Sequence, residues 1–266
     1  MFSSITQWFS NLQANPSGTL ITLAYTAVCI LFSLILHECA HGWVAWKCGD
    51  PTAKMLGRLT LNPLKHLDPL GTICMVFLHF GWAKPVPINP RNFRHYRRDY
   101  ILVSLAGIVA NLLLCILSLI VSALFCRVLY NSYLIEYARN NGFQNNLINS
   151  NYLLPNAILN GEFQAVIGNV NPGSEWVLYI KRFFLLLARM NLYLAVFNLI
   201  PVPPLDGYRF LDMFVFKGKL MIDRRVEQII SIVFMFLLLS GVLNGLINTV
   251  YDFLMDKLCI VMGMLV

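Results

Sequence analysis

Charged side chains are scarce in this sequence of 266 residues: Asp, Glu, Lys and Arg make up only 12% of it, whereas 58% of the residues are hydrophobic. Soluble domains carry about 25% charged residues. The composition therefore excludes an ordinary soluble protein and predicts one that lies in lipid. The net charge of +7 does not indicate nucleic-acid binding. The basic residues of the sequence lie in short runs between apolar segments, as in the cytoplasmic loops of membrane proteins.

Two further absences concern the N-terminus and the cysteines. The first 17 residues contain neither Lys nor Arg. Because the basic region of a secretory signal is missing, we expect the first apolar segment to stay in the mature protein. The seven cysteines form no paired framework. Most lie in or beside apolar stretches, so we expect free thiols that pack as small hydrophobes.

Four apolar segments are long enough for a membrane-spanning helix, which needs about 20 residues; they are 18–46, 100–126, 183–200 and 226–255. Residues 70–83 are apolar but too short to span, and we interpret them as a re-entrant or buried segment. The prolines within 81–90 suit an edge strand, although a plain connecting loop is the alternative. The predicted fold is an α-helical membrane protein with about four transmembrane helices, a partial segment and a short β element.

Positive charges predict the orientation in the membrane. Basic clusters at 47–65, 84–98 and 209–225 fall on one side, the cytoplasmic one, if 70–83 does not cross. The loop at about 127–182 then lies outside, and its residues 131–171 include 11 asparagines. Such a composition predicts a loosely structured extramembrane insertion. We therefore expect one membrane-embedded domain over 1–266, interrupted by this Asn-rich insertion.

The pattern His37-Glu38-Cys39-Ala40-His41 lies in the first apolar segment. Residues i and i+4 of a helix are neighbours on one face, so the two imidazoles can bind one zinc ion. Glu38 lies beside them, where it can take a proton from an attacking water. Charged groups inside a membrane are costly and are functional candidates. The alternative is a pair of histidines at the cytoplasmic end of a span.

Catalytic zinc takes three protein ligands, so we expect a third from another membrane-embedded segment. Asp206 follows the third apolar segment, in the run NLIPVPPLDG at 198–207. Three prolines stop the helix there, and Gly207 permits an unusual turn. A broken element at membrane depth is tolerated where it lines a polar cavity. This favours Asp206 as the third ligand; the alternative is an ordinary turn aspartate.

These motifs resemble the site-2 protease family of intramembrane metalloproteases. The resemblance covers most of the chain and includes RLTLNPLKHLDP at 58–69, GWAKPVPIN at 81–89 and SLAGIVAN at 104–111. It is closest to the compact bacterial and archaeal branch that lacks a PDZ domain, which implies a multi-pass protein of the cell membrane, the bacterial inner membrane, with its active site toward the cytoplasm. The insertion at 127–182 is longer than this branch leads us to expect.

The resemblance also implies the chemistry. It makes Glu38 the general base for hydrolysis of peptide bonds in a single-span membrane protein of the same bilayer. It implies one zinc ion per chain, held by His37, His41 and Asp206. Release of a regulatory domain and clearance of signal-peptide remnants both stay open as the outcome. A membrane metal transporter or sensor without protease activity is the alternative function, although we find no internal repeat.

Two amides and three weaker ligand candidates remain. The resemblance implies that Asn111 and Asn198 support the substrate or the oxyanion, and helix–helix contact is the alternative for both. The weaker candidates are His66, Asp68 and His79. The spacing of His66 and Asp68 suits no standard zinc pair on a helix, so we expect them to position a loop. We expect His79 to be a satisfied buried histidine.

Overall fold

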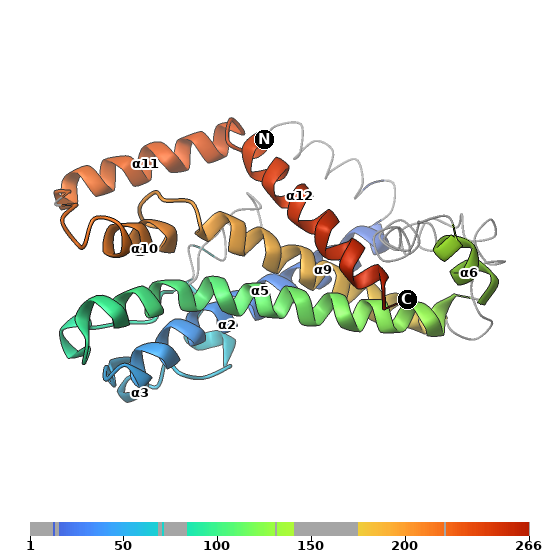
Figure 1. Ribbon diagram of the computed structural model, residues 1–266, viewed down its shortest axis with the longest axis horizontal. Helices are drawn as coiled ribbons and strands as arrows, with labels where there is room; N and C mark the ends of the chain where they lie inside the picture. Colours follow the sequence, from blue (N-terminus) through green and yellow to red (C-terminus); the bar gives the residue numbers. More distant parts are fainter. Residues whose placement is uncertain are drawn as a thin grey trace. The chain divides into compact units, whose positions relative to one another are not determined.

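The computed structural model describes residues 13, 16–68, 71, 84–130, 132–140, 175–220 and 222–265. These residues are mostly helical and contain no β-sheet (Figure 1). They divide into two compact units. Unit 1 holds the described residues of 1–30, 113–193 and 239–266, and unit 2 holds those of 31–112 and 194–238.

Two long helices carry the first two predicted spans. Helix α2 covers Pro16–Lys47 and helix α5 covers Tyr96–Leu129. Within them, Leu23–Lys47 and Tyr96–Leu129 are long and apolar enough to cross a membrane. No other helix of the described residues is both as long and as apolar. The described residues therefore support two membrane-crossing helices, and the expected count of about four is not confirmed.

The other two predicted spans are helical, with different bounds. Helix α9 covers Glu175–Asn198 and includes most of the predicted segment 183–200. The segment 226–255 is not the single helix that the sequence predicts. It is divided between α11 (Arg224–Ser240) and α12 (Asn244–Gly263) by a turn at 241–243. Gly241 has a φ of +81°, a left-handed conformation that ends helices and that glycine adopts without strain.

Shorter elements connect these helices. They are α3 (Thr52–Met55), η1 (Pro63–Lys65), η2 (Pro90–Asn92), α6 (Ser132–Asn140) and α10 (Asp206–Phe214). Of the expected re-entrant segment 70–83 only Gly71 is described, so that prediction lies outside the described residues. Residues 84–89 have no helical or strand assignment, and the expected β element is not found in the described part of 81–90. Within the Asn-rich insertion, 141–174 lies outside the described residues.

The core of unit 2 holds the segment 84–93 against the end of α2. Ala45, Cys48, Phe93 and Val103 form a buried apolar cluster there. Beside it Asp50 is fully buried, and its carboxylate accepts hydrogen bonds from the main chain or side chains of Thr52, Asn89 and Asn92. This polar contact fixes the segment around 89–92 close to the C-terminal end of α2.

Unit 1 has its own apolar core. Cys29, Leu186 and Leu187 form its buried centre, with Phe183 and Tyr25 among the residues packed around it. Cys29 is one of six described cysteines, all of which are free, so the expectation of free thiols holds for them.

Candidate metal centre and active site

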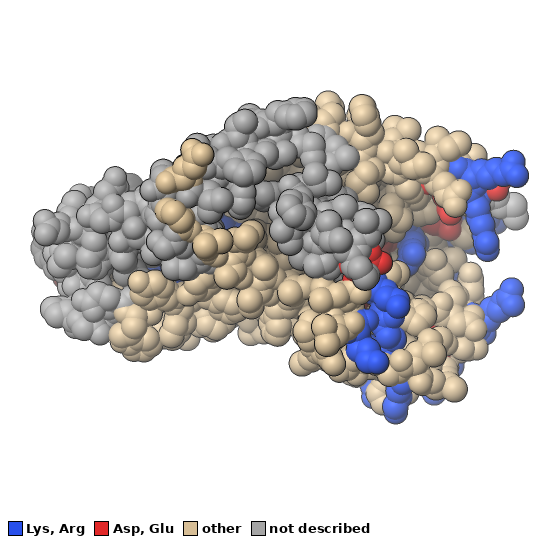
Figure 2. All heavy atoms as spheres, turned by 180° about the vertical axis from the view of Figure 1, so that it is seen from behind, with Lys and Arg blue, Asp and Glu red and all other residues tan. Residues whose placement is uncertain are grey.

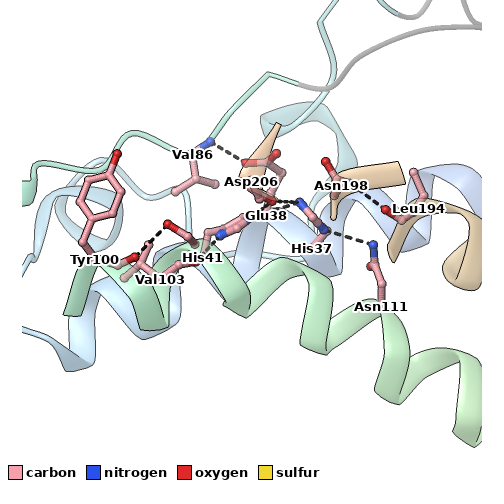
Figure 3. Close-up of polar contacts among 11 residues, drawn as sticks. His37, Glu38, His41, Val86, Tyr100, Val103, Asn111, Leu194, Asn198 and Asp206 are labelled. Atoms are coloured by element: carbon pink, nitrogen blue, oxygen red, sulfur yellow. Dashed lines mark hydrogen bonds and ion pairs between the residues drawn. The ribbon is translucent and has the colours of Figure 1, made fainter. Parts of the chain in front are cut away.

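Three buried side chains meet at one point of unit 2: His37 and His41 from α2, and Asp206 from α10 (Figure 3). His41 Nε2 lies 3.0 Å from His37 Nε2. Asp206 Oδ2 lies 3.0 Å from His41 Nε2 and 3.2 Å from His37 Nε2. Among the described residues, no other group of His, Cys, Asp and Glu brings three ligand atoms this close together.

His37 Nε2, His41 Nε2 and Asp206 Oδ2 form a triangle that has the size expected for three ligands of one ion. Bonds of about 2.0–2.1 Å at tetrahedral angles separate the ligand atoms by about 3.3 Å, and the observed separations are 3.0–3.2 Å. Two imidazoles and one carboxylate are also a donor set of catalytic zinc, which keeps one further position open. The three residues therefore fit a catalytic zinc ion.

Helix α5 contacts the Nδ1 atoms of both imidazoles, on the side of each ring that faces away from the other ligands. A histidine that binds metal through Nε2 carries its proton on Nδ1, where an outer acceptor orients the ring. His41 Nδ1 lies 2.7 Å from Val103 O. His37 Nδ1 lies 3.1 Å from the Asn111 amide, whose buried Oδ1 has no partner. A half-turn of this amide places Oδ1 opposite the Nδ1 proton, so both rings can be held in the tautomer that binds metal.

Gly107 lies between these two contacts on the same face of α5. A Cβ at this position would come within 2.4 Å of both His37 Cε1 and His41 Nε2, far closer than real contacts. The helix can therefore approach the imidazoles only where a side chain is missing. Val103, Gly107 and Asn111 are spaced by four residues, and this spacing is the signal from which the sequence could have identified the face.

Asp206 owes its position to the break between α9 and α10. The segment 199–205 contains three prolines, which prevent a continuous helix. Gly207 lets α10 lie against the preceding turn, since a Cβ there would be 2.3 Å from Leu199 O. At the far end of α10, Arg97 donates to the last two carbonyls of the helix at 3.1 and 3.0 Å. The short helix is thus fixed at both ends.

Glu38 lies on α2 beside His37 and is half-buried. Its Oε2 accepts a hydrogen bond of 2.8 Å from the main-chain N–H of Val86 (Figure 3). Arg58 donates to Lys84 O and Pro85 O at 2.8 and 3.2 Å. The Lys84 and Pro85 carbonyls and the Val86 N–H are therefore already engaged in hydrogen bonds within the protein.

The remaining predicted residues lie outside the triangle. Asn198 donates to Leu194 O of its own helix at 3.0 Å, and its substrate role stays a prediction. The same holds for a substrate contact of Asn111. His66 is buried, with Nε2 2.8 Å from Thr60 O, and Asp68 accepts from Gly71 N at 2.9 Å; both contacts hold a loop. His79 lies outside the described residues.

A cavity of about 850 Å³ adjoins the triangle, and both His41 and Asp206 line it. Its other walls come from the chain between 88 and 104 and from α10 and α11, with Ser104 and Asp212 among the polar residues. Tyr208 and Glu227 also line it and join α10 to α11 through a hydrogen bond of 3.3 Å. The cavity therefore adjoins the triangle with a partly polar lining.

Two histidines, a carboxylate, a nearby glutamate and an open approach define the site of a metal-dependent hydrolase. Residues 25–241 match peptidase family M50. The chain is 35% identical over 218 residues to "Putative zinc metalloprotease YwhC" of Bacillus subtilis (strain 168), which covers 82% of this chain and 81% of that protein. It is 30% identical over 204 residues to "Putative zinc metalloprotease Rip2" of Mycobacterium tuberculosis (strain Erdman), at 72% and 74% coverage. No solved structure gives a significant match.

The chain therefore belongs to peptidase family M50, the site-2 proteases. It is a zinc metalloprotease associated with the membrane. The family assignment and the zinc cofactor that the sequence predicts are thus confirmed.

Proposed function

We propose that this protease hydrolyses peptide bonds within or near the transmembrane segments of membrane proteins. Zinc is held by His37, His41 and Asp206, and Glu38 is the general base. The observation that carries the proposal is the position of the triangle, because two of its corners lie on a helix that is long and apolar enough to cross a membrane.

The end of α2 supports a shallow position of the site within the membrane. Lys47 Nζ lies over the rings of Trp43 and Trp46, at 5.6 and 4.9 Å from their centroids. Tryptophan and lysine of this kind are typical of the membrane–water interface. With a rise of 1.5 Å per residue, His41 and His37 lie about 9 and 15 Å before Lys47 along the axis. That depth supports cleavage just inside the membrane.

The basic loops support a cytoplasmic orientation. The three clusters are in contact within unit 2: Arg94 N donates to Cys48 O at 3.0 Å, and Arg97 reaches the end of α10. Figure 1 draws α3 and the first turns of α5 and α11 at the same end of unit 2, and Figure 2 shows Lys and Arg side chains gathered together on one part of the surface. We infer from the positive-inside rule that this end faces the cytoplasm.

The chemistry divides between the metal and the protein. Zinc, when bound, lowers the pKa of a water and polarises the scissile carbonyl. Glu38 accepts the proton of the attacking water and delivers it to the leaving amine. The cavity beside His41 and Asp206 admits water and the unwound stretch of substrate. Its polar residues on α10 and α11 support an approach from the cytoplasmic end.

The decisive experiment compares wild type with Glu38→Gln in lipid nanodiscs. Zinc content is measured by mass spectrometry, and cleavage is followed on a single-span reporter protein and on a soluble peptide of the same sequence. We expect both proteins to bind zinc and only the wild type to cleave, with the reporter preferred. Full activity of Glu38→Gln would exclude Glu38 as the base. Metal uptake into vesicles without cleavage by wild type would instead favour a transporter.

A labelling experiment tests the orientation separately. Single cysteines at positions 97 and 219 should react with an impermeant maleimide only from the cytoplasmic side, and one at position 145 only from outside. The native cysteines are first replaced by alanine or serine in an active background. Labelling of positions 97 and 145 from the same side would refute the orientation.

A further inference from the structure

The carboxylate of Glu38 has one protein donor in the described part of the chain, the main-chain N–H of Val86. The Val86 N to Glu38 Oε2 distance is 2.8 Å, and Oε1 accepts no hydrogen bond from the described residues. A glutamate side chain has three rotatable torsions, so a base without a fixed partner would spend much of its time in unproductive rotamers. A backbone donor restrains one oxygen and leaves the other available for proton transfer.

The sequence around Val86 makes this donor unusual. Pro85 and Pro87 flank it, and proline has no main-chain N–H. Val86 is therefore the only main-chain donor among three consecutive residues. The prolines also limit the backbone conformations of the segment. Together they place one N–H beside α2 and exclude competing donors from its neighbours.

The segment around Val86 is fixed on both sides. Arg58 holds the carbonyls of Lys84 and Pro85, and Lys84 N donates to His66 O at 2.8 Å. After Val86, the N–H of Asn89 donates to the buried Asp50 carboxylate at 2.7 Å. Because these anchors belong to the segments next to α2, the Val86 N–H is held at a constant place relative to Glu38.

Gly42 provides the space for this approach. It lies one helical turn after Glu38 on the same face of α2. A Cβ at Gly42 would lie 2.9 Å from Val86 Cγ1 and 2.7 Å from Leu59 Cδ2. A larger residue there would force the side chains of Val86 and Leu59 to shift. The contact between the base and the segment thus depends on a glycine, two prolines and a set of anchors.

We propose that the Val86 main-chain N–H is a positioning group for catalysis, which holds Glu38 in the rotamer that accepts the proton of the attacking water. This inference rests on the proposed role of Glu38 and adds what orients it. The Val86 side chain is not required for the effect beyond packing. Substrate binding does not involve this N–H, because the Glu38 carboxylate already occupies it.

The test compares Val86→Pro, which removes the N–H, with Val86→Ala, which keeps it. Both full-length variants are assayed in nanodiscs for zinc content, kcat and KM on the single-span reporter. We expect equal zinc content and similar KM, with kcat of Val86→Pro about 10–100-fold below that of Val86→Ala, the range seen when an outer partner of a metal site is lost. Equal kcat in the two variants, or a higher kcat in Val86→Pro, would overturn the proposal.

A second variant distinguishes loss of the N–H from misfolding of Val86→Pro. Cell-free translation into nanodiscs with an α-hydroxy analogue of valine at position 86 replaces the amide by an ester and retains the side chain. We expect the same loss of kcat without loss of zinc. A change in KM alone would mean that the N–H binds substrate, which also refutes the proposal. Failure of the proposed function is separate: it would appear as equal cleavage by wild type and Glu38→Gln.

Discussion

Replacement of Gly107 by alanine should abolish tight zinc binding although it substitutes none of the proposed ligands. The new Cβ would come within 2.4 Å of His41 Nε2, which is about 1 Å inside the 3.4 Å where ordinary contact begins. It would meet His37 Cε1 at the same distance. Zinc sites tolerate deviations of only about 0.2 Å in ligand distance. Because both imidazoles must move by several times that amount, we expect zinc affinity to fall by at least about 100-fold.

The assay is competition between the purified protein and a chromophoric zinc chelator, with circular dichroism as a measure of helix content. Gly245→Ala is the matched control. Gly245 is also helical, but a Cβ there meets nothing within 4 Å. Alanine is favoured over glycine in a helix by about 1 kcal/mol, so the control should bind zinc normally and unfold at the same or a higher temperature. Zinc affinity of Gly107→Ala within about threefold of wild type would refute the packing argument.

Substitutions of Asp206, Asn111 and Asp50 separate the roles of the surrounding residues. Asp206→Ala should lose zinc and cleavage while His66→Ala keeps zinc, and metal analysis showing the reverse would overturn the choice of third ligand. Asn111→Ala should weaken zinc binding about 10–100-fold in chelator competition; Asn111→Asp should recover part of it, and equal losses would contradict an acceptor role. Burial alone would raise the pKa of Asp50, but its hydrogen bonds hold that pKa below the usual value. The ionised Asp50 carboxylate therefore stabilises the folded protein above about pH 4, and this contribution is lost as the pH falls through the lower pKa of the folded state. Asp50→Asn should cost about 1–3 kcal/mol at pH 7 and flatten the acid side of a thermal-unfolding profile; an unchanged profile would contradict this.

The sequence identified those parts of the site that depend on local geometry. His37 and His41 are one helical turn apart, so their meeting follows from the helix alone. Asp206 could be predicted because three prolines and a glycine mark a broken element after an apolar segment. In each case the residue types and their spacing carry the physical reason.

The contributions of α5 and of the segment 84–89 depend on tertiary packing instead. Val103 O and the Val86 N–H are main-chain groups. The residue type does not indicate which main-chain group will contact a side chain that is distant in sequence. Gly107 appears in an apolar helix, where glycine is common. The division at Gly241 was missed for a different reason: the two glycines of 226–255, Gly241 and Gly245, are too few to interrupt the hydropathy of a continuous span.

The contact between His41 and Asp206 joins residues that are 165 positions apart. A metal ion bound there closes a very long loop of the chain, and that loop contains the whole Asn-rich stretch. The entropy of closing a flexible loop rises only with the logarithm of its length, by about 0.6 kcal/mol for each doubling. Lengthening or shortening the insertion by tens of residues therefore changes the free energy of assembling the metal centre very little. The length of the insertion can thus vary while the metal centre is preserved.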